Sequence, residues 1–478
     1  MLLTDGLLLD YRRCARRAHL NFYEPLEKQP EKDFLTKLRQ ESAAHVKYVL
    51  ENFYPDAQHP HSPEQDFITR ARETEQLMEE GVEFISNGNL LFEDSSKGIT
   101  LLGSPHLLIK VVGDSIWGDW SYISINIQLG RRPKPEYKLI AGYYAYLLSK
   151  VQQKLPDHAQ IILRRNNHHR VNLSEWLPRM EKALLECLAV LSISQEPEVF
   201  ISRQHCSLCH WYTHCYYVAQ RQKHLSLVPG ITPSRYKSLQ SLGLSTLDSL
   251  AGASTSVLEP VFGTQVVHSL KLQAQSLLEK RAFIKSNYLH PLLLTAPWEF
   301  YFDIEAEPEM DLEYLLGVLL VNTKTKELKY YRLLAEDPQQ EALIWMQFLK
   351  VIDQFPTAPI FHYSEYEPET LKKLAHRYKS PTRLLDALLN RCVDLHRLVT
   401  RTVIMPVESY SLKSLANWLG FFWRDPGMSG DQCVCWYDDW LKTRERSLLD
   451  SIVRYNEDDC MATFYLKQWL LDFLTDAK

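Results

Sequence analysis

The feature that most constrains this chain is a largely apolar stretch at residues 298–307, WEFYFDIEAE, in which Asp303 and Glu305 stand two residues apart. Its aromatic and hydrophobic residues predict a β-strand. Because side chains alternate across a strand, Asp303 and Glu305 would share one face, and Ile304 would face a core on the other. Two carboxylates on one face repel each other unless a cation lies between them. The pair therefore predicts a site for a hard divalent cation, Mg²⁺ or Mn²⁺.

The segment around this strand, residues 286–478, predicts an α/β layer fold. Further strands are expected at YLLGVLLVN, LKYYRLLA and APIFHYS. Helices are expected at 338–354, 367–378, 382–390, 411–419, 434–442 and 447–473.

Two more motifs follow the acid pair in this segment. In FHYSEYE, His362 is followed five residues later by Glu367, and in YNEDDCMAT the pair Tyr455 and Asp459 is spaced i, i+4 on one helix face. Each motif alone is weak, since a D-x-E is usually a solvated strand end and acids often gather at a helix N-terminus. Together and in this order, they point to a two-metal phosphodiester hydrolase.

With these motifs, the segment resembles the tyrosine subtype of the DEDD exonuclease superfamily, which has a ribonuclease H-like fold. The resemblance implies 3′→5′ exonuclease activity, with Asp303, Glu367 and Asp459 binding metals. Glu305 would hold one metal and the 3′ end of the substrate, and Tyr455 would orient the attacking water. Glu367 departs from the usual Asp. Asp394 in VDLH and the YSLKS segment match one bacterial branch, which would place Lys413 near the nucleic-acid backbone.

The first block, residues 1–225, mixes predicted helices and strands. Helices are expected at 33–54, 64–88, 136–155 and 174–192, a meander of strands at 101–129, and one more strand at 159–165. The block closes with three cysteines within ten residues, and a fourth stands near its start: Cys206, Cys209, Cys215 and Cys14. In a cytosolic chain this grouping predicts a metal or cluster site rather than disulfides. A [4Fe-4S] cluster, a zinc site and plain buried thiols are the three interpretations.

The cysteine arrangement resembles the iron–sulfur staple of RecB-like nucleases of the AddB and CRISPR-adaptation type, which implies a PD-(D/E)xK nuclease fold and a [4Fe-4S] cluster. The catalytic positions of that fold are lost here. His106 stands where Asp belongs, Asn126 replaces the next Asp, and Gln128 replaces the Lys. Upstream, His45 is kept, but Val46 stands where Glu is common. The prediction is a degenerate nuclease domain retained for binding.

Basic residues beside this lost site could contact phosphates: Arg131, Arg132 and Lys134.

Residues 226–285 predict short helices interrupted by Gly and Pro-Gly. They resemble a helix-hairpin-helix unit, in which backbone amides at a helix N-terminus bind phosphate; a small helical linker bundle is the alternative.

Taken together, the chain resembles RecB-like putative nucleases that join an iron–sulfur domain to a C-terminal exonuclease domain. The 478 residues allow two or three domains, and no apolar run suggests a membrane span or a secretory signal, so a cytoplasmic protein is expected. The net charge of −5 does not exclude DNA or RNA as the partner. Without a Walker A motif, a helicase or repair partner would be a separate chain. The alternative function is a non-catalytic nucleic-acid-binding scaffold.

Overall fold

The structure is a computed structural model that describes residues 1–23, 32–203, 205–285 and 295–476. The chain divides into two compact units. One comprises Met1–Val199 with Arg203–Thr213, and the other comprises Phe200–Ser202 with His214–Lys478. The predicted boundary at residue 286 lies outside the described residues, and the predicted helical domain falls within the second unit. Within the described ranges, no helix is both long and apolar enough to cross a membrane.

The described residues of the first unit form two sheets with strand orders β1-β4-β3 and β2-β5-β6-β7-β8. Strands β6 and β7 are parallel, and helix α5 connects them. The strands are β1 (Leu2–Thr4), β2 (Phe84–Ser86), β3 (Leu90–Asp94), β4 (Ile99–Gly103), β5 (Leu107–Ser115), β6 (Gly118–Ile127), β7 (Ala159–Leu163) and β8 (Asn167–Val171). The helices are α1 (Asp5–Arg13), α2 (Ala15–Tyr23), α3 (Asp33–Phe53), α4 (Phe67–Glu79), α5 (Pro135–Val151) and α6 (Leu173–Leu191).

The helix expected at 64–88 is wrong at its C-terminal end. Helix α4 begins after Asp66, whose side chain accepts a hydrogen bond from the Thr69 backbone N–H at 3.1 Å, and it ends at Glu79. Gly81 then adopts a φ of +71°, a left-handed conformation that suits glycine. The following residues form β2, which pairs with β5 instead of continuing the helix.

Helix α7 (Tyr212–Arg221) leads into a group of helices that form a core of their own around Leu239 and Leu270. They are α8 (Pro233–Ser241), α9 (Leu247–Gly252), α10 (Thr255–Phe262) and α11 (Thr264–Glu279). Strand β9 (Phe283–Ile284) pairs with β15 (Val403–Ile404), and the Gln273 amide donates to the Met405 carbonyl at 2.8 Å. The helical segment is therefore attached to the C-terminal sheet region by direct hydrogen bonds.

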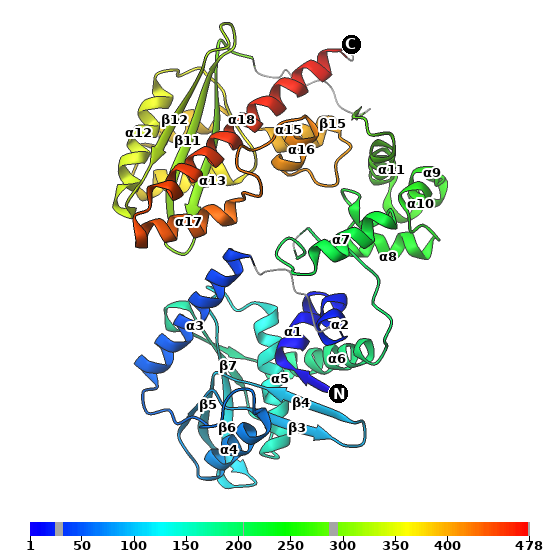
Figure 1. Ribbon diagram of the computed structural model, residues 1–478, viewed down its shortest axis with the longest axis vertical. Helices are drawn as coiled ribbons and strands as arrows, with labels where there is room; N and C mark the ends of the chain where they lie inside the picture. Colours follow the sequence, from blue (N-terminus) through cyan, green and yellow to red (C-terminus); the bar gives the residue numbers. More distant parts are fainter. Residues whose placement is uncertain (24–31, 204, 286–294, 477–478) are drawn as a thin grey trace. The chain divides into compact units, whose positions relative to one another are not determined.

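A five-stranded sheet of order β12-β11-β10-β13-β14 forms the centre of the C-terminal region (Figure 1). Its first three strands are antiparallel, and β13 and β14 run parallel to β10. The strands are β10 (Trp298–Glu307), β11 (Leu312–Asn322), β12 (Leu328–Leu334), β13 (Ile360–His362) and β14 (Cys392–Asp394). The helices are α12 (Glu341–Asp353), α13 (Tyr366–Arg377), α14 (Thr382–Leu389), α15 (Leu395–Thr402), α16 (Leu412–Trp418), α17 (Gly430–Thr443) and α18 (Arg446–Asp476).

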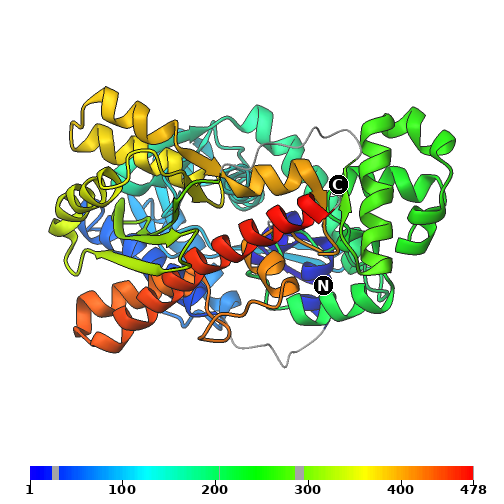
Figure 2. The same ribbon diagram turned by 90° about the horizontal axis from the view of Figure 1, so that it is seen from above.

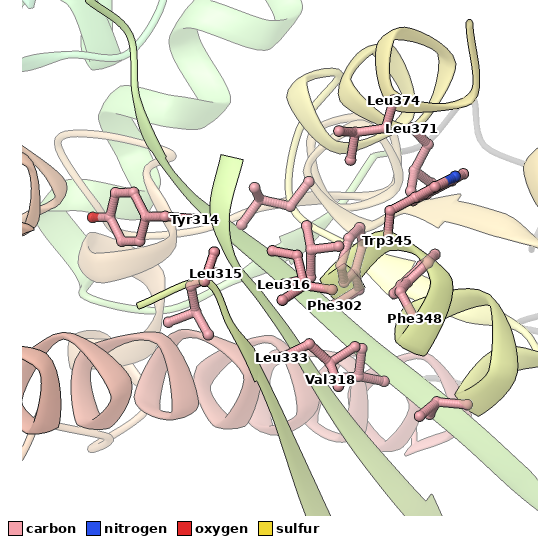
Figure 3. Close-up of a cluster of buried hydrophobic side chains, with 14 of the residues drawn as sticks. Phe302, Tyr314, Leu315, Leu316, Val318, Leu333, Trp345, Phe348, Leu371 and Leu374 are labelled. Carbon is pink, nitrogen blue, oxygen red and sulfur yellow. The ribbon is translucent and has the colours of Figure 1, made fainter. Parts of the chain in front are cut away.

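Successive side chains of β10 point to opposite faces of the sheet, and each face packs against a different helix. On one face, Phe302 packs on Phe348 of α12, with ring centroids 4.9 Å apart, and Figure 3 shows this core. On the other face, Tyr301 packs against Phe464 of α18, at 5.3 Å. Helix α18 is a single helix of 31 residues that crosses the sheet (Figure 2). Because Asp303 and Glu305 are odd-numbered like Tyr301, the strand presents both acids toward α18.

Candidate active site

Three of the predicted acids meet between β10 and α18. The ligand oxygens of Asp303, Glu305 and Asp459 all lie within 4.8 Å of one another. Glu305 and Asp459 are buried, and Asp303 is half-buried. In the described part of the chain, this is the one group of three or more His, Cys, Asp or Glu side chains that gathers so closely.

Burial and mutual repulsion make this cluster unfavourable when it is fully ionised. Burial, followed by the neighbouring Asp459 and Glu305 carboxylates, raises the pKa of Asp303 well above its ordinary value. Burial and Asp459 likewise raise the pKa of Glu305. Burial raises the pKa of Asp459 to about 7, although hydrogen bonds from Trp423 and Tyr455 oppose the shift. Three buried carboxylate donors of this kind fit a hard divalent cation, which would relieve the repulsion.

Helix α18 supplies Asp459 and the predicted Tyr455, one turn apart on the same face. The Trp423 indole N–H donates to Asp459 Oδ1 at 3.0 Å and fixes the carboxylate. Lys413 also lies beside this acid: burial lowers the pKa of its ammonium, and Asp459 opposes the shift. The Lys413 ammonium donates to the Met428 carbonyl and lies 5.4 Å from the centroid of the Trp423 ring. Its predicted contact with nucleic acid stays a prediction.

The neighbouring acid in the DD pair has a different environment. Asp458 accepts hydrogen bonds from the Arg424 backbone N–H at 2.9 Å and from its Nε at 2.8 Å. Of the two adjacent aspartates, Asp459 therefore joins the cluster, and Asp458 holds the segment around Arg424 against α18.

Asn456 is a site residue that no sequence motif indicated. Its Nδ2 donates to Asp303 Oδ2 at 2.6 Å, and the Tyr330 hydroxyl donates to its Oδ1 at 2.8 Å. The amide is fully buried, so both contacts are fixed. Strand β11 makes room for it with Gly317, which pairs with Asp303 in the sheet. A Cβ at Gly317 would lie 1.5 Å from Asn456 Oδ1.

This close approach makes Gly317→Ala a sharp test of the Asn456 contact. The added methyl group cannot coexist with the amide, so Asn456 must turn away and release Asp303. Disturbing a group that orients a metal ligand typically lowers metal affinity about 10- to 100-fold. We expect a shift of this size in Mn²⁺ binding, measured by titration of the metal-free protein. Gly252→Ala, where a Cβ would meet no atom within 4 Å, is the control; equal affinities in both variants would refute the contact's role.

Glu367, the fourth predicted ligand, lies at the edge of the cluster. It is buried in the first turn of α13, and its charge contributes to the raised pKa of Asp303. Ser364 Oγ donates to Glu367 Oε2 at 3.0 Å, and His362 Nδ1 lies 3.5 Å from the same oxygen. The structure therefore places Glu367 near Asp303 but outside the group of three.

The four predicted cluster cysteines are not gathered in this way. Within the described ranges, no three of their sulfur atoms lie within 4.8 Å of one another. The Cys14 thiol does interact electrostatically with Cys209. Burial raises the pKa of the Cys209 thiol in the metal-free protein. Cys206 precedes Cys209 in a turn, and Cys215 lies on α7. The structure thus gives the predicted iron–sulfur cluster no support.

The residues of the predicted degenerate site, His45, His106, Asn126 and Gln128, lie near one another in the first unit. His106 Nδ1 accepts from the Ile127 backbone N–H at 3.0 Å, and Gln128 Nε2 donates to Asn126 Oδ1 at 2.8 Å. Burial lowers the pKa of His106, and a hydrogen bond with Asn126 opposes the shift. Burial also lowers the pKa of His45, followed by repulsion from Arg164. Neutral imidazoles and amides are poor Mg²⁺ ligands, and the loss of catalysis in this unit stays a prediction.

The basic residues predicted to bind phosphates lie together in the loop between β6 and α5. Arg131, Arg132 and Lys134 are all exposed. The Lys134 ammonium lies 5.7 Å from the centroid of the Tyr137 ring. This position is compatible with contact to a nucleic acid, which stays a prediction.

Comparison with known protein families matches residues 300–471 to the RNase H superfamily. The matched segment begins in β10 and ends in α18, so it spans the sheet and all three clustered acids. The C-terminal region is thus an RNase H superfamily domain with an acidic site suited to a divalent metal. No curated protein matches the chain significantly.

Proposed function

We propose that this chain is a metal-dependent nuclease that removes nucleotides from the 3′ end of single-stranded DNA or RNA through its C-terminal domain. The observation that carries the proposal is the buried cluster of Asp303, Glu305 and Asp459 within an RNase H superfamily domain. Such a cluster has little reason to exist without a cation, because burial and repulsion oppose its ionisation. The 3′ polarity comes from the resemblance of the Tyr455 and Asp459 spacing to the tyrosine subtype of DEDD exonucleases.

Each residue has a proposed part in this reaction. Asp303, Glu305 and Asp459 would hold divalent cations, with Glu367 completing the set. Bound there, the cations would provide Lewis-acid stabilisation of the phosphate as its bond to the leaving oxygen breaks. Tyr455, hydrogen-bonded to Asp459, would orient the attacking water. Asn456 would hold Asp303 in position, as the hydrogen bond at 2.6 Å indicates.

The test is digestion of single strands labelled separately at the 5′ and 3′ ends, with Mn²⁺ or Mg²⁺ added to metal-free protein. A 3′→5′ exonuclease produces a descending ladder from the 5′ label and releases mononucleotide at once from the 3′ label. EDTA should prevent both the ladder from the 5′-labelled strand and the release of mononucleotide from the 3′-labelled strand. Internal cuts would contradict the exonuclease assignment. The absence of digestion with every divalent metal, together with tight binding, would favour the non-catalytic scaffold.

For the first unit, we propose a non-catalytic role in binding nucleic acid. Its support is the exposed basic loop that carries Arg131, Arg132 and Lys134 beside residues that offer no metal site. The RecB-like ancestry and a [4Fe-4S] cluster on Cys14, Cys206, Cys209 and Cys215 rest on the resemblance alone. Iron content after anaerobic purification tests the cluster, and a colourless, iron-free protein would exclude it.

A further inference from the structure

A cavity of about 590 Å³ lies beside Glu367, where strands β13 and β14 end. His362 and Ser364 line it from β13 and the turn that follows, Asp394 lines it from the end of β14, and α15 contributes Arg397 and Arg401. Its link to the acidic site is short, because both His362 and Ser364 contact the Glu367 carboxylate. A molecule in this cavity would therefore be next to the acidic site.

Two arginines give this cavity its chemistry. Arg397 and Arg401 are four residues apart on α15 and so share one face, while Leu395 and Val399 bury the opposite face. Both arginines are exposed, and neither makes an ion pair among the described residues. Two neighbouring guanidinium groups thus line the wall of the cavity and are available for an anion.

The acids around the cavity are largely occupied. Asp394 caps α15, accepting from the Arg397 backbone N–H at 3.1 Å, and Glu369 pairs with Lys372 at 2.6 Å. The three lining acids and the three lining bases balance in formal charge, but none of these acids forms an ion pair with Arg397 or Arg401. The two arginines are therefore the groups that a negatively charged ligand would meet.

His362 gives a second, independent indication of a ligand. The side chain is 2% exposed and lines the cavity, and its Nδ1, although 3.5 Å from Glu367 Oε2, makes no hydrogen bond. Buried polar atoms in native proteins are nearly always hydrogen-bonded, so an exception calls for an explanation. A polar ligand in the cavity would provide that partner.

We propose that this cavity binds the phosphodiester backbone of the single strand whose 3′ end lies at the acidic cluster, with Arg397 and Arg401 each contacting a phosphate. The inference rests on the proposed function. Guanidinium groups match phosphate geometry and keep their charge at any physiological pH. The cavity volume is in the range of ordinary ligand sites, which leaves room for part of a strand.

The test uses the variant Arg397→Ala/Arg401→Ala and a control pair, Arg332→Ala/Arg383→Ala, which removes the same charge from exposed positions that do not line the cavity. All are made in an Asp303→Asn background so that the strand stays intact. Fluorescence anisotropy with labelled single-stranded DNA and RNA gives the dissociation constant from low to moderate salt. Each lost phosphate contact lowers the salt slope by about 0.7 on single strands.

We expect the slope of the cavity variant to fall by roughly 1.4, with about 10- to 100-fold weaker binding at low salt, and the control pair to match the parent. Equal slopes in the cavity variant and the control would overturn the proposal.

A second experiment, hydrolysis of a small substrate, distinguishes failure of the cavity proposal from failure of the proposed nuclease function. When the same two pairs of arginine substitutions are made in protein that keeps Asp303, both variants should hydrolyse a nitrophenyl ester of thymidine 5′-phosphate at the wild-type rate. If wild type does not hydrolyse this ester or any strand but the slope still falls, the nuclease assignment fails and the cavity assignment stands.

Discussion

Replacing Asp303 with asparagine is expected to lower the nuclease rate by roughly 10³-fold or more, the scale found when a group central to transition-state stabilisation is removed. Asparagine keeps the shape and still accepts the Asn456 hydrogen bond at Oδ1. It removes one charged donor from the cluster of three. The measurement is the rate of digestion of an end-labelled strand over a range of Mn²⁺ concentrations.

The same variant should be more stable than wild type when no metal is present. Burial and neighbouring carboxylates raise the pKa values in this cluster, that of Asp459 to about 7. The folded protein then binds more protons than the unfolded chain, so stability falls as pH rises from the ordinary carboxyl range through the folded pKa. Removing Asp303 relieves this repulsion. We expect a higher melting temperature for Asp303→Asn at about pH 8, and a smaller difference near pH 4.

With Mn²⁺ bound, the wild type should have the higher melting temperature, because the metal stabilises the wild type and the variant lacks one of its ligands. Asp353→Asn, the same chemical change at an exposed position at the end of α12, is the control and should behave as wild type. Full activity in Asp303→Asn would show that the cluster is not the active site. A lower melting temperature in the metal-free variant would show that the acids do not repel each other in solution.

The sequence predicted most of the C-terminal domain because its strands are strongly apolar. The expected strand at 298–307 matches β10, and the alternation that placed Asp303 and Glu305 on one face is confirmed by the packing of Phe302 and Tyr301 on opposite sides. The spacing of Tyr455 and Asp459 also suffices to place both on one helix face. These features are local, so they depend on no partner element.

Features that depend on contacts between residues far apart in the sequence could not be predicted. Asn456 became a site residue only through the register that pairs Gly317 with Asp303, which a sequence does not display. Strand β14 has three residues, too few for an alternating hydrophobic pattern to be recognised, and α15 follows it directly. The cavity that these two elements line could therefore not be predicted from the sequence. The cysteine spacing, by contrast, looked informative, but among the described residues no three of the four thiols lie within 4.8 Å of one another.

A buried ion pair fixes how α18 lies on the sheet. Lys467 Nζ donates to Glu299 Oε1 at 2.7 Å, and the two side chains are 1% and 0% exposed. The Tyr301 hydroxyl donates to the other Glu299 oxygen at 2.6 Å, and the Lys467 ammonium lies 5.3 Å from the centroid of the Phe361 ring. Lys467 is eight residues beyond Asp459 on the same helix. The pair therefore sets the position along β10 at which α18 presents Asp459.

Removing the lysine should destabilise the protein strongly. Lys467→Met leaves Glu299 buried without its partner, and breaking a buried pair in this way costs about 3–5 kcal/mol. Lys467→Met/Glu299→Gln, which removes both charges, should recover most of this loss, so the double-mutant cycle gives a large coupling energy. Lys442→Met, which breaks the exposed pair with Asp438, is the control and should cost at most about 1 kcal/mol. Urea denaturation measures the free energy of unfolding for wild type, the two single variants Lys467→Met and Glu299→Gln, the double variant and the control. A cost for Lys467→Met no larger than that of Lys442→Met would mean that the buried pair does not hold α18 in place.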